Sequence, residues 1–165
     1  MLAPVLVFAI GNESRGDDAL GPLLLRELDA WLISENLVEK VELLEEFQLQ
    51  IEHILDMKDR KLVLFIDAGM DISSPYLFYR ATPCSGVLLY SHALTPEALL
   101  KIAQGSFKTA PDAFVLCIQG DSFELGDAPT AMALENLSAA LGLVKKLMVK
   151  PDAGHWDRQC LSHTA

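Results

Sequence analysis

The chain has 165 residues, of which 51% are hydrophobic, and carries a formal net charge of −10. This size and composition predict one globular domain with a substantial core, and the acidic charge argues against nucleic-acid binding, which needs clustered Lys and Arg. We expect no secretory signal, because no basic start is followed by an apolar core and a small-residue cleavage site. We expect no membrane span, because no apolar run approaches about 20 residues. The three cysteines, Cys84, Cys117 and Cys160, form no CxxC pair, which favours a reducing, cytoplasmic environment over a disulfide framework.

Apolar runs that suit buried strands alternate with helical patterns along most of the chain. The strand-like runs are residues 5–10, 41–44, 62–66, 86–90 and 114–118. The helical patterns are residues 19–34, 48–57, 95–103 and 129–148, and residues 70–82 are a candidate for one more short strand. This alternation predicts a single three-layer α/β/α domain with a mostly parallel sheet of five strands or slightly more.

Polar residues and prolines mark where the later helices begin. Thr95 is the expected N-cap of one helix, with Pro96 at its first position, and Asp127 or Ala128 with Pro129 is expected to open the last long helix. Residues 151–165 show no apolar periodicity. We therefore assign residues 1–150 to the domain and residues 151–165 to a mobile or loosely docked tail.

The most informative stretch is GNESRGDDALG at residues 11–21, between the first strand-like run and the first helical pattern. Ligands of open α/β sheets bind beyond the carboxyl ends of strands, which is where Asp17 and Asp18 are expected. The turn does not read GxGxxG and has no Lys-Ser/Thr pair, so a nucleotide site is poorly supported. Acidic residues at a helix start also complement the helix dipole, so a structural role for the pair stays open.

Two more polar residues are expected at the same edge of the sheet. Asp67 directly follows the apolar run 62–66, and His92 lies between a strand-like run and a helix start. Two carboxylates and an imidazole suit Zn, Mn or Ni, although the spacing of these residues matches no known metal-binding motif. Structural roles also stay open, because Asp67 can instead cap a turn and an isolated His is more often structural. No GxSxG, HExxH or papain-like motif occurs, so ordinary serine, zinc and cysteine peptidase mechanisms lack support.

Taken in order, these motifs resemble the hydrogenase maturation proteases, endopeptidases that trim the large subunits of nickel-iron hydrogenases. The matching segments are residues 4–12, 16–21, 41–44, 48–52, 65–68, 91–94 and 126–130. Each segment is common, but their ordered combination is specific. Residues 45–48 read EEFQ, where many members have an acidic residue, two glycines and Thr, and Gln48 resembles the branch serving NAD-linked soluble hydrogenases. The family's Pro after the fifth strand is also missing at residues 119–121.

The resemblance implies roles for individual residues. Asp18, Asp67 and His92 match the positions that bind a metal together, and Asp17 matches a supporting position. Asn12 and Gln48 are the expected substrate-binding residues. The implied protein is a monomeric, cytoplasmic endopeptidase whose partner is the nickel-loaded precursor of a hydrogenase large subunit, from which it removes a C-terminal extension. Nickel comes with the precursor, and no organic cofactor is expected.

For the hydrolytic step we expect Asp17, Asp18 and Asp67 to be the catalytic residues. Nickel can polarise the peptide carbonyl or lower the pKa of bound water, and Asp17 can hold the attacking water as general base. A purely positioning role for nickel is equally compatible with the sequence. Two alternative functions stay open: another metal-dependent peptidase on the same fold, such as a relative of spore-type endopeptidases, or a non-catalytic module that recognises the nickel-loaded precursor.

Overall fold

The structure is a computed structural model that describes residues 2–84 and 94–160. Its strands are β1 (Val5–Ile10), β2 (Val41–Glu46), β3 (Leu62–Gly69), β4 (Tyr76–Arg80) and β5 (Asp112–Gln119). Its helices are α1 (Leu20–Ser34), α2 (Ile54–Met57), α3 (Pro96–Ser106), α4 (Ala131–Val149) and α5 (Ala153–Gln159), with short 3₁₀ helices η1 (Gly16–Ala19) and η2 (Ile51–His53). Within the described ranges, no helix is both long and apolar enough to cross a membrane.

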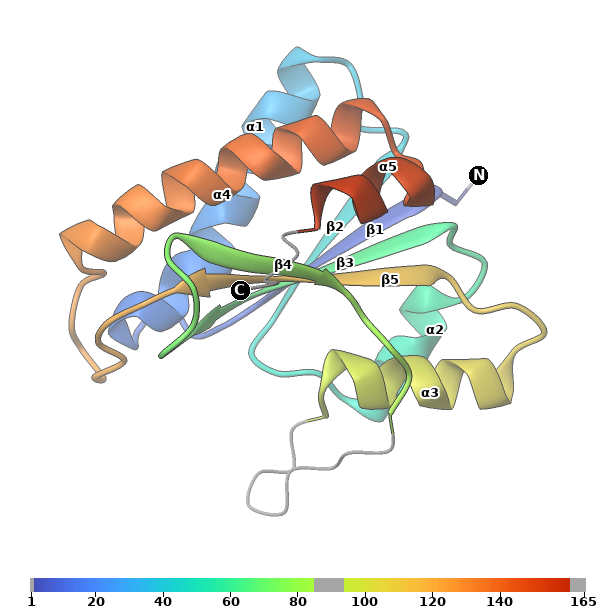
Figure 1. Ribbon diagram of the computed structural model, residues 1–165, viewed down its shortest axis with the longest axis horizontal. Coiled ribbons are helices and arrows are strands. Elements are labelled where there is room, and N and C mark those ends of the chain that lie inside the picture. The colour runs from blue at the N-terminus through green and yellow to red at the C-terminus, as the bar shows by residue number, and fades with distance from the viewer. Residues whose placement is uncertain (1, 85–93, 161–165) are drawn as a thin grey trace.

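The strands form one sheet in the order β2-β1-β3-β5-β4. The pairs among β2, β1, β3 and β5 are parallel, and β4 runs antiparallel to β5. Helices α1, α4 and α5 cover one face of the sheet, and α2 and α3 cover the other (Figure 1). The predicted α/β/α architecture with a mostly parallel sheet is therefore confirmed. Strand β4 lies inside residues 70–82, the segment that was a candidate for one more short strand. The strand expected at residues 86–90 lies outside the described residues.

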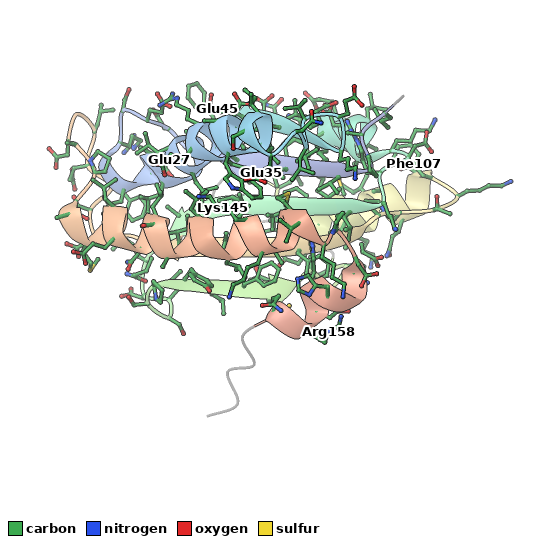
Figure 2. All side chains as sticks on the ribbon, turned by 90° about the horizontal axis from the view of Figure 1, so that it is seen from above. Glu27, Glu35, Glu45, Phe107, Lys145 and Arg158 are labelled. Atoms are coloured by element: carbon green, nitrogen blue, oxygen red, sulfur yellow. The ribbon has the colours of Figure 1, made fainter. Side chains whose placement is uncertain are left out.

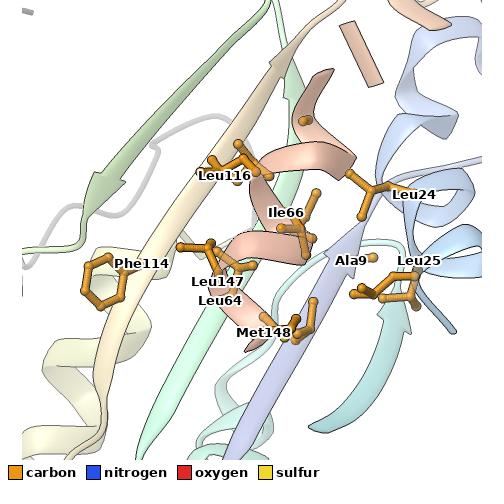
Figure 3. Close-up of a cluster of buried hydrophobic side chains, with 14 of the residues drawn as sticks. Ala9, Leu24, Leu25, Leu64, Ile66, Phe114, Leu116, Leu147 and Met148 are labelled. Carbon is orange, nitrogen blue, oxygen red and sulfur yellow. The ribbon is translucent and has the colours of Figure 1, made fainter. Parts of the chain in front are cut away.

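Two apolar clusters, one on each face of the sheet, hold the layers together. Every residue of β1 is buried, as expected for a parallel strand that is covered on both faces. On one face, α1 contributes Leu20, Leu24, Leu28 and Leu32 at helical spacing to a cluster that also contains side chains of α4. Figure 3 shows Leu24 of α1 and Leu147 of α4 in this cluster, over Leu64 and Ile66 of the sheet. On the other face, Phe8 and Phe65 stack in the layer beneath α2 and α3.

The structure corrects two expectations about element boundaries and confirms a third. The N-cap of α4 is Thr130, whose hydroxyl accepts a hydrogen bond from the Ala133 amide, rather than Asp127 or Ala128. The helix expected over residues 48–57 is shorter, because residues 48–50 are not helical and only η2 and α2 are. At Thr95 the expectation is confirmed: its hydroxyl caps α3 by accepting from the Ala98 amide.

The prediction of a loosely docked tail is wrong for residues 153–159. These residues form α5, and Trp156 is fully buried in the same cluster as the α1 leucines. The Trp156 indole packs edge-on against Phe114, with ring centroids 5.3 Å apart, and its Nε1 donates to the Leu147 carbonyl at 2.9 Å. Asp157 also pairs with Arg80 of β4 at 2.7 Å. These contacts anchor a segment that has no repeating apolar pattern.

Candidate functional site

A cavity of about 330 Å³ opens at the carboxyl edge of the sheet. It contains both Asp18, which follows β1, and Asp67, which lies near the end of β3. The other lining residues come from the end of β1, from the segment after β2 and from the start of α3: Ile10, Phe47, Gln48, Leu49, Leu94, Thr95 and Pro96. The structure thus brings two of the three predicted metal ligands into one cavity, and the third, His92, lies outside the described residues.

Burial disfavours the charged forms of both carboxyls in the cavity. Burial raises the pKa of Asp67 to about 7, with a smaller contribution from the nearby Asp18 carboxylate, although the Ala68 amide donates to Asp67 and lowers it. Burial also raises the pKa of Asp18, against the opposing effects of the Asn12 amide and the Arg15 guanidinium. A bound cation would offset this penalty, because an opposite charge nearby favours the ionised form.

Each of these carboxylates keeps one oxygen available to a ligand. Asp18 uses Oδ2 to accept from the Asn12 amide at 2.7 Å, and Asp67 uses Oδ1 to accept from the Ala68 amide at 2.8 Å. Among the described residues, the second oxygen of each accepts no hydrogen bond, and no buried side-chain oxygen or nitrogen lacks a partner. Hard oxygen donors of this kind suit a divalent cation. In the described ranges no group of three His, Cys, Asp or Glu side chains is close enough to hold a metal.

Asp17, the other acid of the pair, has different surroundings. Its side chain is fully buried and does not line the cavity. Its carboxylate accepts four hydrogen bonds: from the Asp121, Ser122 and Thr130 amides at 2.7, 3.0 and 2.7 Å, and from the Thr130 hydroxyl at 2.9 Å. Burial alone would raise the pKa of Asp17, but these four donors outweigh it and lower the pKa. This arrangement supports a structural role, and nothing in its geometry favours the general-base role predicted for it.

Close backbone packing at two glycines sets the position of Asp18. Gly11 has a φ of +151°, and a Cβ at this residue would lie 2.0 Å from the Asp18 carbonyl oxygen. A Cβ at Gly21 would lie 2.7 Å from the Ile10 carbonyl oxygen and 3.2 Å from that of Ile66. The start of α1 therefore lies directly against the ends of β1 and β3, which brings the two cavity carboxylates together.

The two predicted substrate-binding residues differ in position. Gln48 is exposed and lines the cavity. Asn12 lines a neighbouring hollow, and its contact with the site is the amide that donates to Asp18. Sequence reasoning missed Phe47, which lines both spaces and is 76% exposed. It also missed Thr130, although the motif Ala-Pro-Thr before a helical pattern is a recognisable capping signal.

No model of a known protein family matches this sequence, and no curated protein matches it. Solved structures do match. The hydrogenase maturating endopeptidase HybD of E. coli has a TM-score of 0.72 at 18% identity, over 89% of this chain and 93% of its own. The hydrogenase maturation protease HycI of Thermococcus kodakarensis has a TM-score of 0.68 at 21% identity, over 90% and 94%. The endopeptidase HycI of Escherichia coli has a TM-score of 0.62 at 15% identity, over 87% and 90%.

These matches cover most of this chain and most of each matched chain. The carboxylate cavity lies at the sheet edge where open α/β folds bind their ligands. The chain therefore has the fold of the nickel-iron hydrogenase maturation proteases.

Proposed function

We propose that this protein is an endopeptidase that removes a C-terminal extension from the nickel-loaded large-subunit precursor of a nickel-iron hydrogenase. The observation that carries the proposal is the pairing of Asp18 and Asp67 in one open cavity, on the fold of the hydrogenase maturation proteases. The ordered motifs of the sequence support the same assignment, since they include both acids and His92.

In this proposal Asp18, Asp67 and His92 contact nickel that the precursor already holds. The free carboxylate oxygens can reach a cation, and a cation offsets the burial that raises the pKa of both carboxyls. Three ligands of mixed oxygen and nitrogen type leave coordination positions open, unlike the closed four-ligand shell of a structural site. Such a set suits a metal that is shared for a short time with another protein, so nickel acts as a checkpoint before cleavage.

The residues of this chain bind and orient the precursor. The nickel supplies Lewis-acid chemistry, because it can polarise a carbonyl or lower the pKa of bound water. Asp17 acts indirectly: its four hydrogen bonds fix the turn that carries Asp18. Gln48 lies at the cavity, where it can donate to a peptide carbonyl of the substrate.

The test mixes the purified protein with precursor prepared with and without nickel and follows the loss of C-terminal mass. We expect cleavage of the nickel-loaded precursor only, and loss of cleavage in Asp18→Asn, Asp67→Asn and His92→Ala variants. His155→Ala, a substitution outside the cavity lining, is the matched control for His92→Ala and should stay active. Equal cleavage of both preparations would indicate a conventional peptidase with its own ion, and binding without cleavage would indicate a recognition module.

A further inference from the structure

The outer edge of β2 is bordered by a series of hollows that lead to the carboxylate cavity. Phe47 lines both the cavity and a hollow of about 360 Å³. Glu45 lines that hollow and the next, of about 280 Å³, which in turn shares Asp29 and Leu43 with a hollow of about 1060 Å³. The shared residues make these spaces neighbours in a row along β2, which we call the β2 groove.

Strand β2 has unused backbone groups along this groove. Within the described part of the chain it pairs with β1 alone. The Lys40 and Glu46 carbonyls accept from the β1 side, at Val5 and Gly11. In a parallel ladder alternate residues direct both backbone groups to the same neighbour, so those of Leu43 and Glu45 point outward. Glu45 lies at this outer edge of the molecule, beside α1 (Figure 2). An extended peptide could pair there as one more strand.

The middle hollow of the groove has the composition of a subsite for a cationic side chain. Its walls are apolar at Pro22, Leu25 and Leu43, and it contains the carboxylates of Asp29 and Glu45. Its one basic residue, Arg26, pairs with Glu13. Neither Asp29 nor Glu45 has an ion-pair partner among the described residues. A Lys or Arg side chain can lay its aliphatic stem on such walls and place its charged end between the carboxylates.

We propose that the segment of the precursor next to its cleavage site binds in extended form along β2 and places a Lys or Arg side chain in the Asp29–Glu45 hollow. This inference rests on the proposed function and adds how the substrate is recognised. From Leu43 to Phe47 an added strand spans about 13 Å at about 3.3 Å per residue, which brings it to the mouth of the cavity. Pairing of two β2 strands from two copies of this chain is disfavoured, because it would oppose acidic edges.

The test measures cleavage of the nickel-loaded precursor by four proteins. The Asp29→Asn/Glu45→Gln double variant removes both charges of the acidic subsite, and Glu45→Pro removes an outward amide together with the Glu45 carboxylate. Each should raise KM about tenfold, the equivalent of about one charged or main-chain contact, with kcat nearly unchanged. Glu135→Gln on α4 makes the same kind of charge change outside the groove and should match the unsubstituted protein. Urea unfolding of each variant checks that the fold is intact.

A second measurement needs no variant. Hydrogen exchange of the unsubstituted protein is followed with and without a synthetic peptide of the precursor's C-terminal region. We expect new protection at the Leu43 and Glu45 amides, and weaker binding when the peptide's Lys and Arg are replaced by Gln. Unchanged KM in the β2-groove variants, or peptide binding without protection at these amides, would refute the inference and leave the proposed function standing. No cleavage of nickel-loaded precursor by the unsubstituted protein would refute both.

Discussion

Replacing Asp17 by Asn tests whether this acid supports the site or reacts in it. The wild-type carboxylate is fully buried and accepts four hydrogen bonds, three at Oδ2 and one at Oδ1. An Asn side chain has one acceptor oxygen. If that oxygen takes the Oδ2 position, the amide NH₂ group faces the Thr130 N–H, and two donors then oppose each other.

The expected cost follows from these contacts. One buried N–H left without an acceptor costs about 1–3 kcal/mol, and the three remaining bonds lose the extra strength of a charged acceptor. Together these effects predict a loss of about 3 kcal/mol or more in the free energy of unfolding at neutral pH, out of the roughly 5–15 kcal/mol typical of a domain. With a urea m-value of about 2 kcal/mol/M, the unfolding midpoint should fall by about 1.5 M.

The pH dependence of this difference has a defined sign. The folded-state pKa of Asp17 is lowered, so its carboxylate contributes stability above the unfolded-state pKa of about 3.9, and that stability is lost as pH falls through the folded-state pKa. The difference in the free energy of unfolding between the wild-type protein and Asp17→Asn should therefore be largest at neutral pH. It should narrow in acid, once the wild-type carboxyl takes up a proton.

The assay is urea unfolding followed by circular dichroism, with Asp18→Asn as matched control. Asp18 accepts one hydrogen bond, which an Asn carbonyl can also accept, and its charged form is disfavoured by burial. Asp18→Asn should therefore unfold within about 0.5 kcal/mol of wild type, as expected where no special contact is lost. Wild-type stability in Asp17→Asn, together with complete loss of cleavage, would refute the structural role and favour the general-base role.

The remaining predictions concern the site, α5 and the cysteines. Asp67→Asn should fold and lose cleavage, which mass analysis of the precursor checks. Trp156→Ala should lower the free energy of unfolding by about 3–5 kcal/mol, because it empties a fully buried site, whereas a truly loose tail would tolerate the change in a urea titration. Thr130→Val should lower the free energy of unfolding more than Thr130→Ser, because only Ser keeps the hydroxyl that donates to Asp17 and caps α4. A double-mutant cycle with Asp17→Asn measures the coupling energy between Thr130 and Asp17. Serine- and cysteine-directed reagents should leave cleavage nearly intact, and inactivation by labelling Cys84 or Cys117 would contradict a metal-centred site.

The sheet and the placement of Asp18 and Asp67 could be predicted because their signals are local. Apolar runs without alternation are typical of parallel strands buried on both faces, and β1 and β3 are of this kind. An acid that follows such a run must lie at the carboxyl edge of the sheet. Parallel strands share that edge, so Asp18 and Asp67 had to be neighbours once β1 and β3 paired.

The surroundings of Asp17 could not be predicted from local sequence. Its hydrogen-bond donors lie 104 to 113 residues further along the chain, in the loop between β5 and α4. Helix α5 was missed for a related reason, because its attachment depends on single contacts with distant residues, Trp156 with Phe114 and Asp157 with Arg80, rather than on a repeating pattern. Strand β4 differs, because its successive residues Phe78 and Tyr79 pack on opposite faces of the sheet. Such an apolar pair is visible in the sequence.

The different roles of Asp17 and Asp18 follow from the backbone that carries them. Both lie in the 3₁₀ helix η1, where successive side chains point about 120° apart because there are about three residues per turn. One acid therefore turns inward to the β5–α4 loop, and the next turns into the cavity. The buried charge of Asp17 holds η1 against that loop, and this fixes the position of Asp18. The opposing carboxylate, Asp67, lies on β3, which pairs with β1 on one side and β5 on the other. Both carboxylates are thus held by well-ordered backbone, as the proposed contact with a metal already seated in another protein requires.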